Sequence, residues 1–350
     1  MSDLPDFAQV VGQNKAISRL ETLVQSLNHH FIIFSGPPGQ GKKTLAKAFA
    51  SAILTTYGNP FHGEEPGLTG MAKIDQATIR HLFVAGTHPD YFEVLIGEEG
   101  KIIPVDRVRD VVADVEMLPQ MGRYKVYLIE GDGLNEAGQN ALLKTLEEPP
   151  NYAIFLLTIS GQNRLLETIY SRGVEIHLSA NSETEIATIL ERVFTDKDGI
   201  SLALPAKFAN GCPGRAIDLA ASDWFMPVRQ EIFELVQLLL TAKPAHILEK
   251  GWTLFEAYRD QEINLFDLLT AWLRDLLLCC DPRVSSSHLI NFDAVQDLRN
   301  LTKKCANPQK NIVGALSVIN KVRMARHYNG NFEICIHYLL LQMRKELQYA

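Results

Sequence analysis

Residues 36–44 read Gly36-Pro-Pro-Gly39-Gln-Gly41-Lys42-Lys43-Thr44, a glycine-rich turn that ends in two lysines. The turn follows a short apolar run, FIIFS (31–35), and precedes TLAKAFASAIL (44–54), whose apolar residues have helical spacing. A strand, a glycine-rich turn and a helix in this order are typical of a phosphate-binding loop. The candidate nucleotide-binding residues here are Gly36, Pro37, Gly39, Gly41, Lys42, Lys43 and Thr44.

Each part of this loop has a chemical reason. The glycines let backbone N–H groups turn inward around phosphate oxygens, and Lys42 can reach the β- and γ-phosphates as a point charge. The helix that follows directs its positive end toward the same place. The alternative interpretation is a glycine-rich turn between a strand and a helix that binds no ligand.

The residue after the lysine departs from the usual motif. Ser or Thr at that place is a ligand of Mg²⁺, whereas this chain has Lys43 there and Thr44 one place later. One residue along a helix is a rotation of about 100°, so we expect Thr44 to point away from the ion. Lys43 either points outward as a surface lysine or adds positive charge where Mg²⁺ would lie.

The rest of the first half alternates strands with helices, which predicts an α/β domain with a mostly parallel sheet. A turn at 87–89 precedes a second strand, and Asn135 is the expected N-cap of a helix that Pro149-Pro150 stops. The expected strands are 31–35, 124–130, 153–160 and 174–178, and the expected helices are 105–119 and 135–148.

The strand YKVYLIE (124–130) ends in an unusual acidic pattern. Phosphate-loop ATPases place Asp at this strand end to hold Mg²⁺, and a following Glu commonly polarises the attacking water. Here Glu130 takes the first place and Gly131 the second, with Asp132 close by. Since the Mg²⁺ hydroxyl and the catalytic carboxylate are both displaced, we expect little or no hydrolysis. The alternative is that Glu130 and Asp132 are solvated turn residues.

The second half of the chain is helical. Residues 183–222 contain short helices interrupted by NGCPG (210–214), and from about residue 225 long helical stretches follow without strand alternation. We therefore expect three domains. They are a phosphate-loop α/β domain (1–178), a helical lid (179–224) and an all-helical C-terminal domain (225–350).

Composition excludes several classes of protein. The formal net charge of the 350 residues is −7, which argues against coating nucleic acid by bulk charge. The five cysteines form no C-x-x-C pair, so a disulfide framework is not expected. No apolar run reaches about 18 residues and the N-terminus lacks a signal pattern. We expect a cytoplasmic protein without a membrane span.

One stretch carries a family resemblance. LNEAGQNALLKTLEEPPNYAIFLLTIS (134–160), followed by ETIYSRG (167–173), resembles the AAA+ clamp-loader subunits of bacterial DNA polymerase III. Within that family the chain is more similar to the delta-prime branch than to the ATPase gamma/tau branch. The phosphate loop and acidic strand are degenerate, GTHPDYFEV (86–94) and VDRVRDVV (105–112) resemble delta-prime stretches, and gamma/tau subunits run longer than 350 residues.

The resemblance implies roles for three residues. Clamp-loader subunits carry Ser-Arg-Cys where this chain has Ser171-Arg172-Gly173, so Arg172 is the expected arginine finger for a neighbouring subunit's ATP site. Thr158 matches the first nucleotide sensor and Arg215 the second. The alternatives are a surface arginine before an edge strand, a polar strand end and a helix-surface arginine, respectively.

The resemblance also implies a function. The chain is expected to be a largely non-hydrolysing subunit that joins gamma/tau and delta subunits through a C-terminal collar domain and helps to load the sliding clamp on primed DNA. The complex belongs to a DNA-directed DNA polymerase holoenzyme, a nucleotidyltransferase, and ATP or ADP binding by this chain is expected to be weak or absent. The alternatives are an active gamma/tau-like ATPase and a nucleotide-regulated AAA+ interaction protein outside replication.

No zinc is expected. Many relatives carry a four-cysteine zinc module just before the GTHPD stretch, whereas residues 55–85 contain no cysteine. Three histidines in this region, His62, His81 and His88, are too few and too scattered to replace thiolate ligands.

Overall fold

The computed structural model divides the chain into two units, and each is described by itself. Unit 1 comprises Met1–Thr195 with Asn210–Ala216, and unit 2 comprises Asp196–Ala209 with Ile217–Ala350. The predicted lid is thus shared between the units, and the three predicted domains stay predictions. The residues that the structure describes are 6–57, 76–97, 100, 102–195, 199–305 and 307–348.

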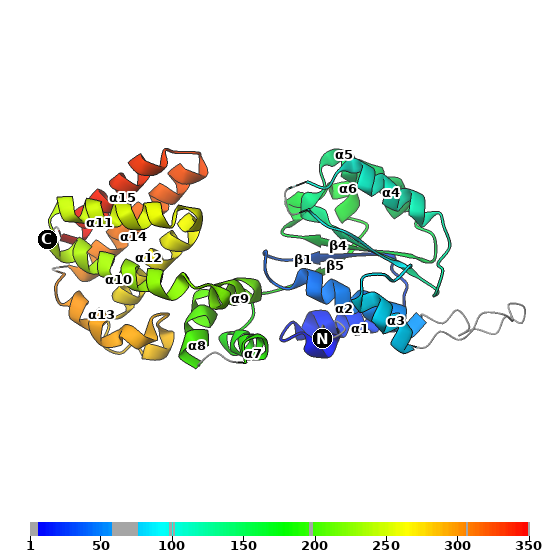
Figure 1. Ribbon diagram of the computed structural model, residues 1–350, viewed down its shortest axis with the longest axis horizontal. Coiled ribbons are helices and arrows are strands. Elements are labelled where there is room, and N and C mark those ends of the chain that lie inside the picture. Colours follow the sequence, from blue (N-terminus) through cyan, green and yellow to red (C-terminus); the bar gives the residue numbers. More distant parts are fainter. Residues whose placement is uncertain are drawn as a thin grey trace, which may run out of the picture. The chain divides into compact units, whose positions relative to one another are not determined.

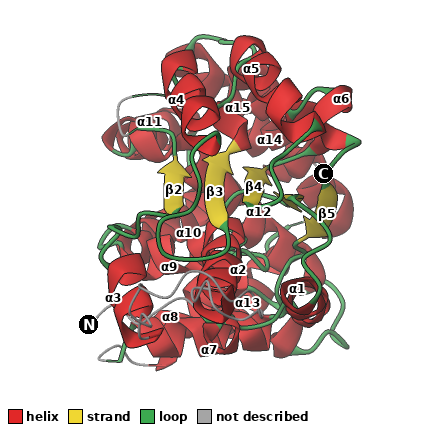
Figure 2. Cartoon of the chain, turned by 90° about the vertical axis from the view of Figure 1, so that its right-hand side faces the viewer, coloured by secondary structure: helices red, strands yellow, loops and turns green. Residues whose placement is uncertain are grey.

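The core of unit 1 is a parallel sheet (Figure 2). Within the described residues its strands are β1 (Phe31–Ser35), β2 (Tyr91–Val94), β3 (Lys125–Glu130), β4 (Ala153–Ile159) and β5 (Val174–His177), in the order β2-β3-β4-β1-β5. All neighbouring strands are parallel, and burial of both faces explains why their sequences are continuous apolar runs. The prediction of a parallel α/β domain is confirmed, and the strands predicted at 124–130, 153–160 and 174–178 are each one residue shorter.

Helices cover both faces of this sheet (Figure 1). One face carries α1 (Asn14–Gln25), α2 (Lys42–Tyr57) and α3 (Gln76–Val84), and the other carries α4 (Val105–Val115), α5 (Glu136–Glu147) and α6 (Glu167–Tyr170). Because successive strand residues point to opposite faces, Phe34 packs in the core with Phe49 of α2, whereas Ile33 packs in the core with Leu142 of α5. The sheet therefore separates two apolar cores.

The structure confirms one predicted helix end and corrects another. Asn135 is the N-cap of α5, as predicted, and its side-chain oxygen accepts a hydrogen bond of 2.8 Å from the backbone N–H of Gly138. The helix predicted over 105–119 was too long, because α4 ends at Val115. Pro119 disfavours helical backbone at the residue before it, and the loop that follows α4 is held by a carboxylate from another part of the chain.

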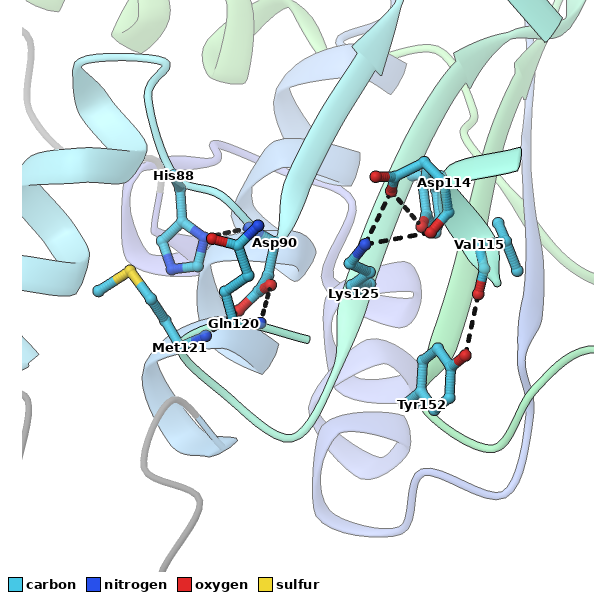
Figure 3. Close-up of polar contacts among 9 residues, drawn as sticks. His88, Asp90, Asp114, Val115, Gln120, Met121, Lys125 and Tyr152 are labelled. Atoms are coloured by element: carbon cyan, nitrogen blue, oxygen red, sulfur yellow. Dashed lines mark hydrogen bonds and ion pairs between the residues drawn. The ribbon is translucent and has the colours of Figure 1, made fainter. Parts of the chain in front are cut away.

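That carboxylate belongs to Asp90, which is fully buried next to β2 (Figure 3). It accepts backbone hydrogen bonds from the N–H groups of Gln120 at 2.6 Å, Met121 at 2.7 Å and Gly122 at 3.1 Å. These N–H groups are thereby held in the loop that follows α4. The N–H of Asp90 itself donates to Nδ1 of the buried His88 at 3.1 Å.

The buried His88 predicts a pH dependence of stability. Burial lowers the pKa of His88 below its ordinary value of 6.5, although the charge of Asp90 opposes this. As the pH falls below 6.5, the unfolded chain binds the proton before the folded chain does, so the free energy of unfolding falls. A single proton limits this loss to about 1.4 kcal/mol per pH unit. Above pH 6.5 the contribution of His88 is fully present.

The measurement compares urea unfolding of the wild type and His88→Asn between pH 7.5 and 5.5. The asparagine oxygen can accept the same hydrogen bond from the residue two places on, but it does not titrate. We expect the variant to lose less stability than the wild type over this range. Equal losses would show that His88 contributes nothing to the pH dependence.

Unit 1 continues beyond the sheet into α7 (Glu183–Val193), whose start carries a capping box. The Ser182 side chain accepts from the N–H of Glu185, and the Glu185 carboxylate accepts from the N–H of Ser182. The expected short helices on either side of NGCPG are α8 (Gly199–Phe208) and α9 (Pro213–Ala221). Helix α8 belongs to unit 2, and the chain passes from unit 1 to unit 2 for the last time within α9.

The regular elements of unit 2 are all helices within its described residues, as predicted from residue 225 onward. Its large core surrounds Trp272, whose indole N–H donates to the carbonyl of Arg229 at 3.1 Å. Among the described residues of the whole chain, no helix is long and apolar enough to cross a membrane. The long helices of unit 2 are α10 (Phe225–Thr241), α11 (Pro244–Ala257), α12 (Glu262–Leu278), α14 (Pro308–His327) and α15 (Phe332–Gln348), and α13 (Val295–Thr302) is shorter.

Candidate nucleotide site and arginine finger

The phosphate loop joins β1 to α2 in unit 1. Gly39 and Gly41 have positive φ angles of 78° and 83°, which glycine adopts without strain. The N–H of Gly36 donates to the carbonyl of Ile159 at the end of β4, at 3.2 Å. The loop therefore lies at the carboxyl edge of the sheet, where ligands bind in open α/β sheets.

Lys42 is bound within this loop. Its ammonium donates to the carbonyl oxygens of Gly36 at 2.6 Å and Pro37 at 2.9 Å. Burial lowers its pKa, while the charge of Asp132 opposes this. These contacts hold the ammonium beside the backbone that would surround a phosphate.

Lys43 and Glu130 form an ion pair at the place where a metal ion would be expected. The Lys43 ammonium lies 2.9 Å from Oε2 of Glu130, and the same oxygen accepts a hydrogen bond from the N–H of Ile96 at 3.0 Å. The Lys43 side chain is 45% exposed while it pairs with Glu130, and whether its charge takes the place of Mg²⁺ stays a prediction. Glu130 is only 17% exposed and is not a solvated turn residue. Thr44, one place later, is exposed.

Gly131 leaves no space for a catalytic carboxylate. A Cβ atom at this position would lie 2.7 Å from Cγ2 of Ile159 and 3.2 Å from the carbonyl oxygen of Thr158. Asp132, the next residue, accepts hydrogen bonds of 2.9 Å from both the N–H and the hydroxyl of Ser160. Asp132 therefore braces the end of β4 and is not a solvated turn residue.

The two candidate sensors lie on different elements of unit 1. Thr158 is buried in β4, in register with Glu130 of β3. Arg215 lies in the first turn of α9, which packs on the phosphate loop: the N–H of Gly214 donates to the carbonyl of Gly39 at 2.8 Å. The structure thus brings Arg215 close to the loop in the fold, and the sensor roles of both residues stay predictions.

Cys212 was not among the predicted site residues, yet it contacts the phosphate loop. Its thiol donates to the carbonyl of Pro38 at 3.4 Å, and a Cβ atom at Gly39 would lie 2.6 Å from its sulfur. Nothing in the local sequence indicates this contact, because about 170 residues separate the two segments.

Arg172 lies at the opposite edge of the sheet from this loop. It lies two residues before β5, which runs parallel to β1, whereas the phosphate loop follows β1. Val174 is in register with Ile32, so about four strand residues, roughly 13 Å, separate the start of β5 from the level of Gly36, and Arg172 precedes that start. The backbone at Arg172 therefore lies at the edge of the sheet remote from the chain's own phosphate loop.

The backbone at Arg172 is held firmly. The N–H of Arg172 donates to the carbonyl of Ile169 at 3.1 Å, and the N–H of Gly173 donates to that of Tyr170 at 3.3 Å. A Cβ atom at Gly173 would lie 2.6 Å from Cγ1 of Ile33 and 3.1 Å from the ring of Phe31. The cysteine of the family pattern therefore does not fit beside these two large residues of β1.

The Arg172 side chain pairs with a residue that the sequence did not single out. Nη2 lies 2.7 Å from Oε1 of Glu147, at the end of α5, and Nη1 donates to the carbonyl of Thr168. The two side chains stay 37% and 47% exposed. Arg172 is thus both on the surface and fixed in direction.

Metal binding was also a question raised by the sequence. Among the residues that the structure describes, no group of three or more His, Cys, Asp and Glu side chains is placed to hold a metal ion. Much of the expected zinc-free segment, residues 58–75 with His62, lies outside those residues. The absence of zinc stays a prediction.

The comparisons with known proteins agree on one family, the subunits of DNA polymerase III. Residues 12–182 match the family described as "DNA polymerase III, delta subunit", a range that includes the phosphate loop and Arg172. The chain is 34% identical over 240 residues to DNA polymerase III subunit tau/gamma of Haemophilus influenzae, covering 67% of this chain and 33% of that protein. It is 40% identical over 147 residues to DNA polymerase III subunit delta-prime of Pseudomonas aeruginosa, covering 42% of each.

The matched part is thus less than half of the length of these two relatives. Among solved structures, a DNA polymerase III gamma subunit-related protein of Thermotoga maritima is 17% identical, with 94% of this chain and 99% of that chain covered and a TM-score of 0.42.

Proposed function

Because the chain belongs to the clamp-loader family of DNA polymerase III subunits, we propose that it is the delta-prime subunit, which completes a neighbouring subunit's ATP site with Arg172. The observation that carries this proposal is the position of Arg172. It is exposed and held in direction at the sheet edge opposite to the chain's own phosphate loop. A guanidinium there is suited to the γ-phosphate of a nucleotide bound by another subunit.

The degenerate nucleotide site favours delta-prime over an active gamma/tau-like ATPase. The Lys43 ammonium pairs with the Glu130 carboxylate that would otherwise hold Mg²⁺, and Gly131 has no space for a side chain that could polarise water. Both the metal and the general base of the usual mechanism would have to be accommodated by rearrangement. We infer weak nucleotide binding or none, and little or no hydrolysis by this chain.

The chemistry supplied to the neighbour is electrostatic. In the transition state of phosphoryl transfer, charge spreads over the γ-phosphate oxygens, and a guanidinium placed there stabilises it. The proposed partners are the gamma/tau and delta subunits, joined through the helices of unit 2. The assembled complex would act on the sliding clamp and primed DNA in the cytoplasm, as part of the polymerase holoenzyme.

The test asks whether the chain's own phosphate loop hydrolyses ATP. We expect the isolated chain to show negligible ATP turnover, and we expect Lys42→Ala to leave the DNA-stimulated ATPase of the reconstituted complex within about twofold of the wild type. The physical reason is that Lys42 takes part in no hydrolysis, whereas the equivalent lysine of an active phosphate loop contacts the transferred phosphate. The measurement is steady-state ATP hydrolysis by complexes reconstituted from gamma/tau, delta and this chain.

Two outcomes would contradict the proposal. Robust turnover by the isolated chain, abolished by Lys42→Ala, would identify an active ATPase of the gamma/tau kind. Failure of the chain to enter a complex with gamma/tau and delta would favour a nucleotide-regulated interaction protein outside replication. Melting temperatures of both proteins control for damage to the loop that Lys42 helps to hold.

A further inference from the structure

Resting on the proposed finger role of Arg172, we propose that Glu147 is a positioning residue that orients the Arg172 guanidinium for the neighbouring subunit's phosphate. Oε1 of Glu147 lies 2.7 Å from Nη2 of Arg172, while Nη1 donates to the carbonyl of Thr168. A carboxylate and a carbonyl thus fix the plane of the guanidinium from two directions.

This arrangement leaves the finger able to bind. A guanidinium has five N–H donors in a rigid fork. The contacts with Glu147 and Thr168 use two of them, so three remain for phosphate oxygens. Glu147 can therefore keep hold of Arg172 while the finger is engaged, and the arginine need not be released before it acts.

A contribution to the stability of α5 does not explain why residue 147 is a glutamate. Glu147 is the last residue of α5, where the partial negative charge of the helix end disfavours an anion. An ion pair between side chains as exposed as Glu147 and Arg172 also contributes little to folding. What the pair does fix is the direction of a long, flexible side chain.

The two elements that carry the pair are themselves joined. Gln139, buried in α5, accepts a hydrogen bond of 2.7 Å from the N–H of Leu166 and donates to the carbonyl of Arg164 at 3.0 Å. It therefore ties α5 to the segment that leads into α6. Because Glu147 and Arg172 lie at the ends of these connected elements, their separation is set by the fold of unit 1.

The experiment measures DNA-stimulated ATP hydrolysis by the reconstituted complex with Glu147→Ala, Glu147→Gln and the matched control Glu148→Ala. We expect Glu147→Ala to lower kcat at the neighbouring subunit's ATP site, which Arg172 is proposed to complete, roughly 10- to 100-fold, with KM for ATP unchanged. This is the effect of misplacing a reacting group. Glu147→Gln keeps an oxygen that can accept from Nη2 and should restore part of the rate. The neighbouring Glu148→Ala should match the wild type.

A double-mutant cycle with Arg172→Ala separates the two proposals. If Glu147 acts through Arg172, Glu147→Ala has no further effect in the Arg172→Ala background. If Arg172→Ala lowers hydrolysis but Glu147→Ala does not, or if Glu147→Ala lowers it equally in both backgrounds, the positioning role is wrong and the finger stands. If Arg172→Ala itself has no effect, the proposed function is wrong. Melting temperatures within about 1 °C of the wild type are expected for both Glu147 variants, since the pair is exposed.

Discussion

Replacing Arg172 with alanine is expected to slow ATP hydrolysis at the neighbouring site by about 10³-fold or more, the loss measured when an arginine finger is removed from phosphoryl-transfer enzymes. This corresponds to about 4 kcal/mol of transition-state stabilisation. The reason is the loss of a guanidinium that offers several N–H donors to the γ-phosphate oxygens. Other ATP sites of the complex keep their own fingers, so single-turnover kinetics is the measurement that resolves the affected site.

Two controls make this result interpretable. Arg172→Lys keeps the positive charge without the planar fork, so it should recover only part of the rate. Assembly, followed by gel filtration, should not change, because Arg172 contacts its own chain only through exposed or backbone groups of α5 and α6. Normal DNA-stimulated hydrolysis at the neighbouring site in single-turnover kinetics of the Arg172→Ala complex would rule out the finger.

The largest effect on stability is expected from Asp90→Ala. The substitution leaves the N–H groups of Gln120, Met121 and Gly122 without their acceptor. A hydrogen bond to a charged group contributes about 1.5–3 kcal/mol, but the residues that carry these donors are exposed or half-buried and water can replace part of the loss. We therefore expect the free energy of unfolding of unit 1 to fall by about 3 kcal/mol. Urea unfolding followed by far-UV circular dichroism measures this loss.

The exposed Asp110 of α4 is the matched control, and Asp110→Ala should change stability by less than about 0.5 kcal/mol. Asp90→Asn should fall between the two, since its amide oxygen can accept while its NH₂ group faces donors. A loss below 1 kcal/mol for Asp90→Ala would show that the loop at 116–124 finds other partners.

Local sequence was sufficient for those parts of the fold whose causes are local. Strands β1, β3, β4 and β5 were predicted because buried parallel strands are continuous apolar runs. The cap at Asn135 was predicted because the capping oxygen and its donor lie three residues apart. Helix α3 was not predicted, although Asp75 before it is a residue type that commonly begins a helix.

The parts that were wrong or missed depend on contacts between distant segments. The loop that follows α4 is held by Asp90, which precedes Gln120 by 30 residues. Whether Lys43 faces solvent or Glu130 depends on how α2 lies on β3, which no local pattern specifies. The pairing of Glu147 with Arg172 likewise requires the juxtaposition of α5 and α6.

The tight packing of Gly173 against β1 constrains how this sequence can evolve. A cysteine at position 173 would require Ile33 to give way, and Ile33 is itself fully buried in the sheet. The two positions are therefore coupled: with isoleucine at position 33, a cysteine at position 173 can be accommodated only if Ile33 shifts. A smaller residue at position 33 would make room for the cysteine, but beside Gly173 it would leave a cavity, and that variant is expected to be less stable.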